Sequence, residues 1–208
     1  MPTFTSTFMF EDNDTWRVTR NERLRDALIP ESNYRFSYID IHNELYPLAL
    51  QTSFEFLTRN HSGRYRDRTL MTIRRWADSV AATTPVQRIN ESYSDANRPF
   101  PIVMIAEAPF SYDEETESKN GGIVGVNVGI DDSDGGWKGI VAVAAGARTK
   151  KIGTTLIRAM TSVSSVGAFD YYASNKNFNA ARVAAALGFT PVSINSETGV
   201  VHYRMLDQ

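Results

Sequence analysis

The stretch "IVAVAAGARTKKIGTTLIRAM", residues 140–160, constrains the fold more than any other part of the chain. It begins with an unbroken apolar run, passes through small residues and cations, and continues with apolar residues at helical spacing. This order predicts a strand buried on both faces, then a loop and a helix. Because the N–H groups and the dipole at a helix N-terminus favour bound phosphate, the loop is a candidate anion-binding site.

The segments before this stretch predict a strand, two helices and a meander. A strand over "YRFSYIDI" precedes the first helix, within residues 42–57, where Pro47 must lie in the first turn. The second helix covers residues 66–82, and residues 84–100 are expected to form a loop. Three strands joined by short turns, at residues 101–110, 123–130 and 138–145, predict an antiparallel meander. The predicted apolar helix faces are Leu45, Leu48, Ala49, Phe54 and Leu57, and then Leu70, Ile73, Ala77 and Val80.

The segments after this stretch complete a mixed fold. The helix that starts near residue 152 is expected to end at Gly167. "AFDYYAS" predicts a strand, and "NFNAARVAAAL" a helix closed by Gly188. "FTPVSIN" and "VVHYRML", joined by "SETG", predict a hairpin. From residue 35 the predicted order is β-α-α-β-β-β-α-β-α-β-β, which defines an α/β domain.

Residues 1–34 are predicted to be an N-terminal extension or arm on a domain formed by residues 35–208. "TFTSTFMF" alternates aromatic and hydroxyl residues, as a short half-buried strand does. The charged segment after it predicts a partial helix. Two interpretations stay open: the arm docks on a protein partner, or its strand and helix pack on the chain's own core.

Composition excludes several classes of site. The 208 residues include no cysteine, so the chain forms no disulfide or thiolate site and fits a reducing cytoplasm and a virion equally. His42, His61 and His202 lie far apart in sequence, so we expect no metal. No apolar run approaches the roughly 18 residues of a spanning helix, so we expect no membrane contact. The net charge of −2 argues against nucleic acid as a partner, despite the arginines between residues 59 and 75.

From about residue 35 onward the chain resembles the GNAT superfamily of N-acetyltransferases. The run Arg148, Thr149, Lys150, Lys151, Ile152, Gly153 is similar to the family's loop motif of Arg or Gln, two residues, Gly, one residue, then Gly or Ala. Asn177, with Leu187, Gly188 and Phe189, resembles the motif of an asparagine that opens a helix ending in Leu-Gly-Phe. The closing strand pair resembles the family's C-terminal hairpin. The resemblance implies a mixed, mostly antiparallel central sheet flanked by helices.

The resemblance also implies a cofactor site for acetyl-CoA. The pantetheine arm of acetyl-CoA would pair with the strand end around Val143, Ala144 and Ala145, and Asn177 would support the same arm. The resemblance assigns the pyrophosphate to the loop and helix start, comprising Arg148, Thr149, Lys150, Lys151, Ile152, Gly153 and Thr154. The implied activity is transfer of an acetyl group to an amine of a small molecule or protein, without a metal.

The sequence departs from the family pattern at three places. Lys151 occupies the central glycine of the loop motif, where a positive φ would cost about 1 kcal/mol, although a lysine can also pair with phosphate. Ala184 stands where the family often has a tyrosine that protonates the departing thiolate. The segment "GGWKGIV" lacks the glutamate base of some members, and Glu107 is either a substitute or a carboxylate at the rim of the sheet.

These departures leave the catalytic residues unassigned and a second hypothesis open. The chain is either an acetyl-CoA-dependent N-acetyltransferase or a catalytically degenerate structural or interaction protein with the same fold. An example of the latter is a bacteriophage virion component docked through residues 1–34. The sequence identifies neither the acceptor nor a partner.

Overall fold

The computed structural model describes residues 4–5, 34–60, 66–94, 100–113, 118–132, 136–148, 151–163 and 168–206. Within them, eight strands form one sheet in the order β1-β2-β3-β4-β5-β6-β8-β7. The strands are β1 (Phe4–Thr5), β2 (Arg35–Ile39), β3 (Ile102–Asp113), β4 (Ser118–Asp132), β5 (Gly136–Val143), β6 (Ala168–Ser174), β7 (Thr190–Asn195) and β8 (Val200–Leu206). The mixed α/β fold and the meander β3-β4-β5 are therefore confirmed.

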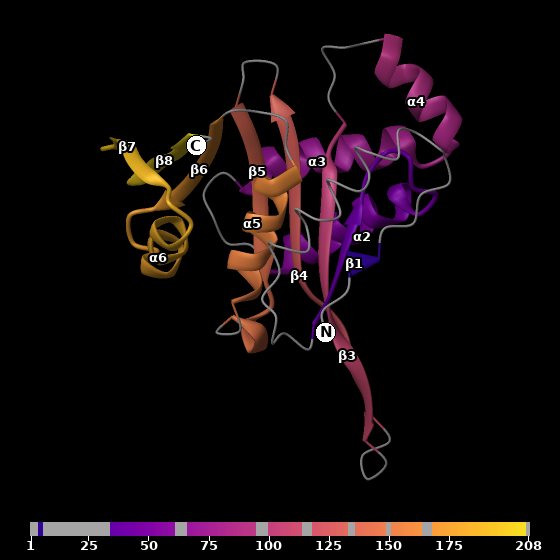
Figure 1. The fold of residues 1–208 in the computed structure, drawn as a ribbon, viewed down its shortest axis with the longest axis horizontal. Helices are drawn as coiled ribbons and strands as arrows, with labels where there is room; N and C mark the ends of the chain where they lie inside the picture. Colours follow the sequence, from indigo (N-terminus) through magenta and orange to yellow (C-terminus); the bar gives the residue numbers. More distant parts are fainter. Residues whose placement is uncertain are drawn as a thin grey trace.

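Helices cover both faces of this sheet. They are α2 (Tyr46–Asn60), α3 (Arg66–Val80), α4 (Pro85–Ser94), α5 (Ile152–Val163) and α6 (Phe178–Ala186). Helices α2 and α3 lie on one face, α5 lies across β4 and β5 on the other, and α6 lies beside β6, β7 and β8 (Figure 1). The far end of β3 projects away from the body (Figure 1). None of the helices in the described ranges is both long and apolar enough to cross a membrane.

The strand pairing is mostly antiparallel, as the resemblance implied. β2, β3, β4 and β5 pair antiparallel in succession, as do β6 with β8 and β8 with β7. The exceptions are the parallel pairs β1–β2 and β5–β6. β5 and β6 share a single described pair, Trp137 with Phe169, so the sheet is joined weakly at this point.

Alternation along the strands builds two cores, one on each face. On β4 and β5, Val126, Val128, Ile140 and Ala142 pack toward α2 and α3. The opposite core contains Ile152, Leu156 and Met160 of α5 together with Phe169, Ala184 and Phe189. Burial on both faces explains why β5 has a continuous apolar sequence instead of alternating residues.

Gly125 lets α5 approach β4 closely. A methyl group at this position would lie 2.8 Å from Cγ2 of Ile152 and 3.0 Å from Cδ1 of Leu156, both of which are buried. We therefore expect Gly125→Ala to lower the free energy of unfolding by about 1–2 kcal/mol, as overpacking of a core does. Urea denaturation measures the change. Gly146→Ala is the control, because its Cβ would meet no atom within 4 Å; equal effects of the two variants would refute the close-packing argument.

The prediction that residues 84–100 form a loop is wrong, because α4 occupies residues 85–94. The residues at the start of α4 are typical of a helix N-terminus. Thr84 and Gln87 form a reciprocal capping box: the Gln87 N–H donates to Oγ1 of Thr84 at 3.3 Å, and the Thr84 N–H donates to Oε1 of Gln87 at 2.8 Å. Pro85 stands at the first helical position, where its missing N–H costs nothing.

Arg88, on this helix, is fully buried. Its guanidinium donates to three backbone carbonyls: Nε to Ile41 at 3.0 Å, Nη1 to Thr83 at 2.6 Å and Nη2 to Asn43 at 2.8 Å. Its charge also lies 5.6 Å from the centre of the buried Tyr46 ring. Desolvation lowers the pKa of Arg88 from its ordinary value. Arg88 thus joins α4 to the connection between β2 and α2.

The apolar face predicted for the first helix is partly wrong. Leu45 precedes α2, and Leu45 and Leu48 are exposed. The buried face of α2 comprises Tyr46, Ala49, Leu50, Ser53 and Leu57. The buried face of α2 differs from the predicted one because Tyr46 points into the core, where its hydroxyl donates to the Pro101 carbonyl at 2.7 Å. On α3, Leu70, Ile73 and Val80 are buried as predicted.

Several predictions fall at the limits of the described residues. In the N-terminal extension only Phe4, Thr5 and Tyr34 are described, and Phe4 and Thr5 pair with Phe36 and Ser37 as a parallel edge strand. The partial helix after them and Gly167 lie outside the described residues. Gly188 and Gly199 have φ of +83° and +66°, which supports their predicted places at a helix end and in the β7–β8 hairpin.

Candidate cofactor site

Beyond Trp137, β5 has no described strand partner on the side that faces β6, and we call this unpaired stretch between the two strands the gap. The Ala144 N–H donates to the Val124 carbonyl of β4 at 2.8 Å. Because antiparallel partners alternate in the direction of their hydrogen bonds, Val141 and Val143 direct their N–H and C=O groups toward the β6 side. An extended ligand with amide groups could pair there as an added strand.

The predicted extended conformation of residues 143–145 holds for Val143 and for Ala144, whose φ and ψ are −56° and 144°, but not for Ala145. A 3-10 turn, η1 (Ala145–Ala147), follows β5, and the Ala147 N–H donates to the Ala144 carbonyl at 2.9 Å. Arg148 then turns back, and its Nε lies 3.4 Å from the Val143 carbonyl oxygen. This contact brings the exposed guanidinium to the end of β5, at the mouth of the gap between β5 and β6.

Lys151 has the backbone shape of the glycine that it replaces. Its φ is +58°, and it is the one non-glycine residue with a positive φ in the described ranges. The left-handed conformation costs an L-residue roughly 1–2 kcal/mol. The Lys151 carbonyl accepts from the N–H of Thr155 at 3.0 Å and from its hydroxyl at 3.1 Å, which starts α5.

The first turn of α5 is the part of the site that is predicted to bind an anion. The N–H groups of Ile152, Gly153 and Thr154 belong to this turn, whose N–H groups have no carbonyl partner within a helix. Ile152 is buried and anchors the turn, whereas Lys151 is exposed beside it. A Cβ at Gly153 would lie 3.4 Å from Cγ2 of Val143, so the turn sits against the end of β5. Thr149 and Lys150 lie outside the described residues.

Asn177 and Ala184 lie on α6, beside β6. Oδ1 of Asn177 accepts from the Ala180 N–H at 3.1 Å and caps the helix, so only its amide NH2 group is available to donate to a ligand. Ala184 is 1% exposed and belongs to the core. The position where the family often has its tyrosine thus carries no acid.

Glu107 belongs to a surface ion pair. Its Oε2 lies 2.9 Å from Nε and 2.7 Å from Nη2 of Arg35, its register partner on β2. β3 is separated from β5 by β4, which places Glu107 away from the gap. Of the two interpretations of Glu107, the structure supports the carboxylate at the rim of the sheet.

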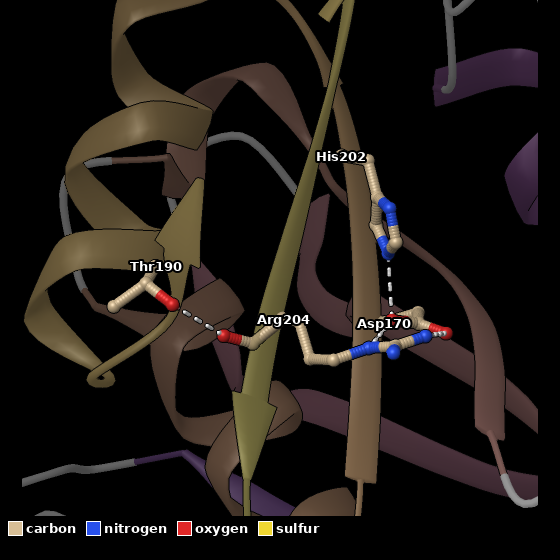
Figure 2. Close-up of polar contacts among 4 residues, drawn as sticks. All are labelled: Asp170, Thr190, His202 and Arg204. Carbon is tan, nitrogen blue, oxygen red and sulfur yellow. Dashed lines mark hydrogen bonds and ion pairs between the residues drawn. The ribbon is translucent and has the colours of Figure 1, made fainter. Parts of the chain in front are cut away.

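A polar cluster that the sequence analysis did not identify lies across β6 and β8; we call Asp170, His202 and Arg204 the Asp170 cluster (Figure 2). The Asp170 side chain is 8% exposed. Arg204 donates to both oxygens, from Nε to Oδ1 at 2.8 Å and from Nη2 to Oδ2 at 3.1 Å, and Nε2 of His202 lies 2.6 Å from Oδ1. Hydrogen bonding by Arg204 lowers the pKa of Asp170 below its ordinary value, against the opposing effect of burial, and His202 adds to the lowering.

The Asp170 cluster faces away from α6 (Figure 2). Tyr172, two residues along β6, is half exposed, and its ring stacks on the His202 ring with centroids 4.7 Å apart and planes 11° apart. The sequence held one signal, since His202 and Arg204 are two apart in a predicted strand and must share a face. The sequence alone does not show that β6 pairs with β8, which is what brings Asp170 next to His202 and Arg204. Among the described residues, no group of three His, Asp or Glu side chains is arranged to hold a metal.

Comparison with known proteins identifies the fold. No protein-family model and no curated protein matches the sequence. Solved structures do match. A mutant spermidine/spermine N-acetyltransferase SpeG from Vibrio cholerae shares 12% identity over 85% of this chain and 95% of its own, with a TM-score of 0.50. The NatC complex bound to Gag peptide and CoA includes a chain with 14% identity, 85% and 100% coverage, and a TM-score of 0.50. The chain therefore has the fold of the GNAT acetyltransferases.

Proposed function

We propose that the protein is an acetyl-CoA-dependent N-acetyltransferase whose acceptor is an amine of a small molecule or protein. The observation that carries the proposal is the left-handed Lys151 at the start of α5, in the segment that follows β5, a strand with a single described pair to β6. The structural neighbours that are acetyltransferases support the same class of reaction. Bound acetyl-CoA would supply an activated acetyl thioester.

The residues of this chain would hold the cofactor in two parts. The backbone groups of Val141 and Val143 would pair with the amides of the pantetheine arm, and the Asn177 NH2 group would donate to the same arm. The first amides of α5 would receive the pyrophosphate, with Arg148 and Lys151 as flanking cations. Holding amine and thioester together would then supply much of the rate. Isothermal titration with acetyl-CoA tests this arrangement, and no heat of binding at millimolar ligand would refute it.

Replacing Lys151 separates its backbone role from its charge. We expect Lys151→Gly to raise the free energy of unfolding by about 1 kcal/mol, because glycine adopts positive φ without strain. We also expect it to weaken acetyl-CoA binding about threefold, because an exposed cation beside a helix N-terminal phosphate contributes about 0.3–1 kcal/mol. Chemical denaturation and titration calorimetry measure the two effects. Lys151→Ala is the control, since it should lose the affinity without gaining the stability; tighter binding by both variants would mean that Lys151 obstructs the site.

The buried Ala184 favours a second candidate, a GNAT-fold protein that binds a partner without catalysis. Such a protein would need neither the thiolate acid nor a base. The same titration separates the candidates, because a failure to bind acetyl-CoA would favour the non-catalytic role. Docking through residues 1–34 and a place in a bacteriophage virion stay predictions.

A further inference from the structure

We propose that His202 is the general base that accepts a proton from the acceptor amine, and that Asp170 is the positioning residue that holds it. The proposal rests on the proposed acetyl transfer. It gives the protein the base that "GGWKGIV" lacks and that Glu107, engaged with Arg35, does not provide.

The contacts of Asp170 fix which nitrogen of His202 carries the proton. Arg204 donates to both carboxylate oxygens, so Asp170 is an ionised acceptor. Nε2 of His202, 2.6 Å from Oδ1, must then be the protonated nitrogen. In the neutral imidazole the lone pair is left on Nδ1. An oriented carboxylate that selects the histidine tautomer is the arrangement by which a histidine acts as a base.

The cluster lies on the side from which an acceptor could approach. Asp170 and Tyr172 are on β6, the strand that borders the gap, and they share its face because they are two residues apart. This face points away from α6, whose start carries Asn177, so cofactor and acceptor would use opposite sides of the sheet (Figure 2). The His202 side chain is 19% exposed and therefore still reaches solvent. Its stacking on Tyr172 holds the ring toward β6.

The proposed step is balanced without any further reactant. The amine nitrogen bonds to the thioester carbonyl carbon, its proton moves to Nδ1 of His202, and the carbon–sulfur bond breaks with its electron pair leaving on sulfur. His202 then returns the proton to solvent. The His202 ring contacts Asp170 and Tyr172, and Arg204 shares the Asp170 carboxylate with it.

The test uses the full-length protein with acetyl-CoA and two amine probes, spermidine and a short peptide with a free N-terminus. Release of the coenzyme A thiol is followed from pH 5 to 8. We expect His202→Gln to lower kcat about 100-fold or more, with acetyl-CoA binding unchanged, and to abolish the rise of the rate with pH. Asp170→Asn should give a smaller loss of kcat, and His42→Gln, which is remote in sequence and lies before α2, should change nothing.

Each outcome bears on a different claim. A wild-type protein that does not bind acetyl-CoA overturns the acetyltransferase function and the base with it. Transfer that survives His202→Gln with its pH dependence intact overturns the base alone. Nitrogen NMR of the wild-type imidazole gives a second measurement that needs neither acceptor nor variant. A proton on Nε2 supports the proposal, and one on Nδ1 in the neutral ring overturns it.

Discussion

Replacement of Arg88 by methionine is expected to lower the free energy of unfolding by about 3–5 kcal/mol, the range for removing one member of a buried charged network. Methionine fills a similar volume but donates no hydrogen bonds. The carbonyls of Ile41, Thr83 and Asn43 would then stay buried without this donor, and each such loss costs about 1–3 kcal/mol in isolation. Urea denaturation at pH 7 measures the change, with the far-UV CD of the variant as the test that it still folds.

Two further variants sharpen this expectation. Arg75→Met removes an exposed arginine from α3 and should change stability by no more than about 0.5 kcal/mol. Arg88→Lys keeps the charge but cannot present a planar fork to three carbonyls, so we expect most of the loss to remain. A fully stable Arg88→Lys variant would show that charge, and not the geometry of the guanidinium, holds α4 to the β2–α2 connection.

Asp170→Asn is expected to lower the free energy of unfolding by about 2–3 kcal/mol at pH 7, as hydrogen bonds to a charged group do. The pKa of Asp170 is lowered in the folded protein, chiefly by Arg204. A lowered carboxyl pKa contributes stability above the unfolded pKa and loses it as the pH falls through the folded value. The difference between variant and wild type should therefore be full above about pH 4 and shrink below it. Urea unfolding of both proteins from pH 7 to pH 3 measures this.

Asp78→Asn provides the matched control for Asp170. Asp78 faces Arg74 one helical turn away at 3.8 Å, with 74% of its side chain exposed. Exposed pairs of this kind contribute about 0.3–0.5 kcal/mol, so the control should stay close to wild type at every pH. If the Asp170 difference persisted undiminished at pH 3, the loss would come from packing and not from the ionised carboxylate.

The sequence predicted the parts of the fold that depend on local periodicity. The strand, loop and helix of residues 140–160 lie where the pattern put them, as do α6 and the terminal hairpin. Lys151, at the motif's glycine position, has a positive φ of 58°, the backbone conformation that a glycine adopts without strain. α4 was missed because its mixed composition suggested a loop, although Thr84, Pro85 and Gln87 carried a helix start.

The candidate site was less predictable, because its geometry depends on strand pairing. Among the described residues β6 pairs with β5 only at Trp137, and no local pattern in the sequence reveals where two strands separate. The Asp170 cluster likewise requires the pairing of β6 with β8, from segments more than 30 residues apart in the chain. The sequence alone therefore gives His202 no partner.

The near-sequential strand order has a consequence for the speed and order of folding. From β2 to β6 each strand pairs with the next strand in the chain, and the meander joins its strands through short turns. Closing short loops costs little chain entropy, so contacts between sequence neighbours form early. We infer that β3, β4 and β5 pair first and that the remaining elements then pack against this three-stranded sheet. The β6–α6–β7–β8 unit would dock last, because among the described residues one strand pair and one shared core join it to the rest.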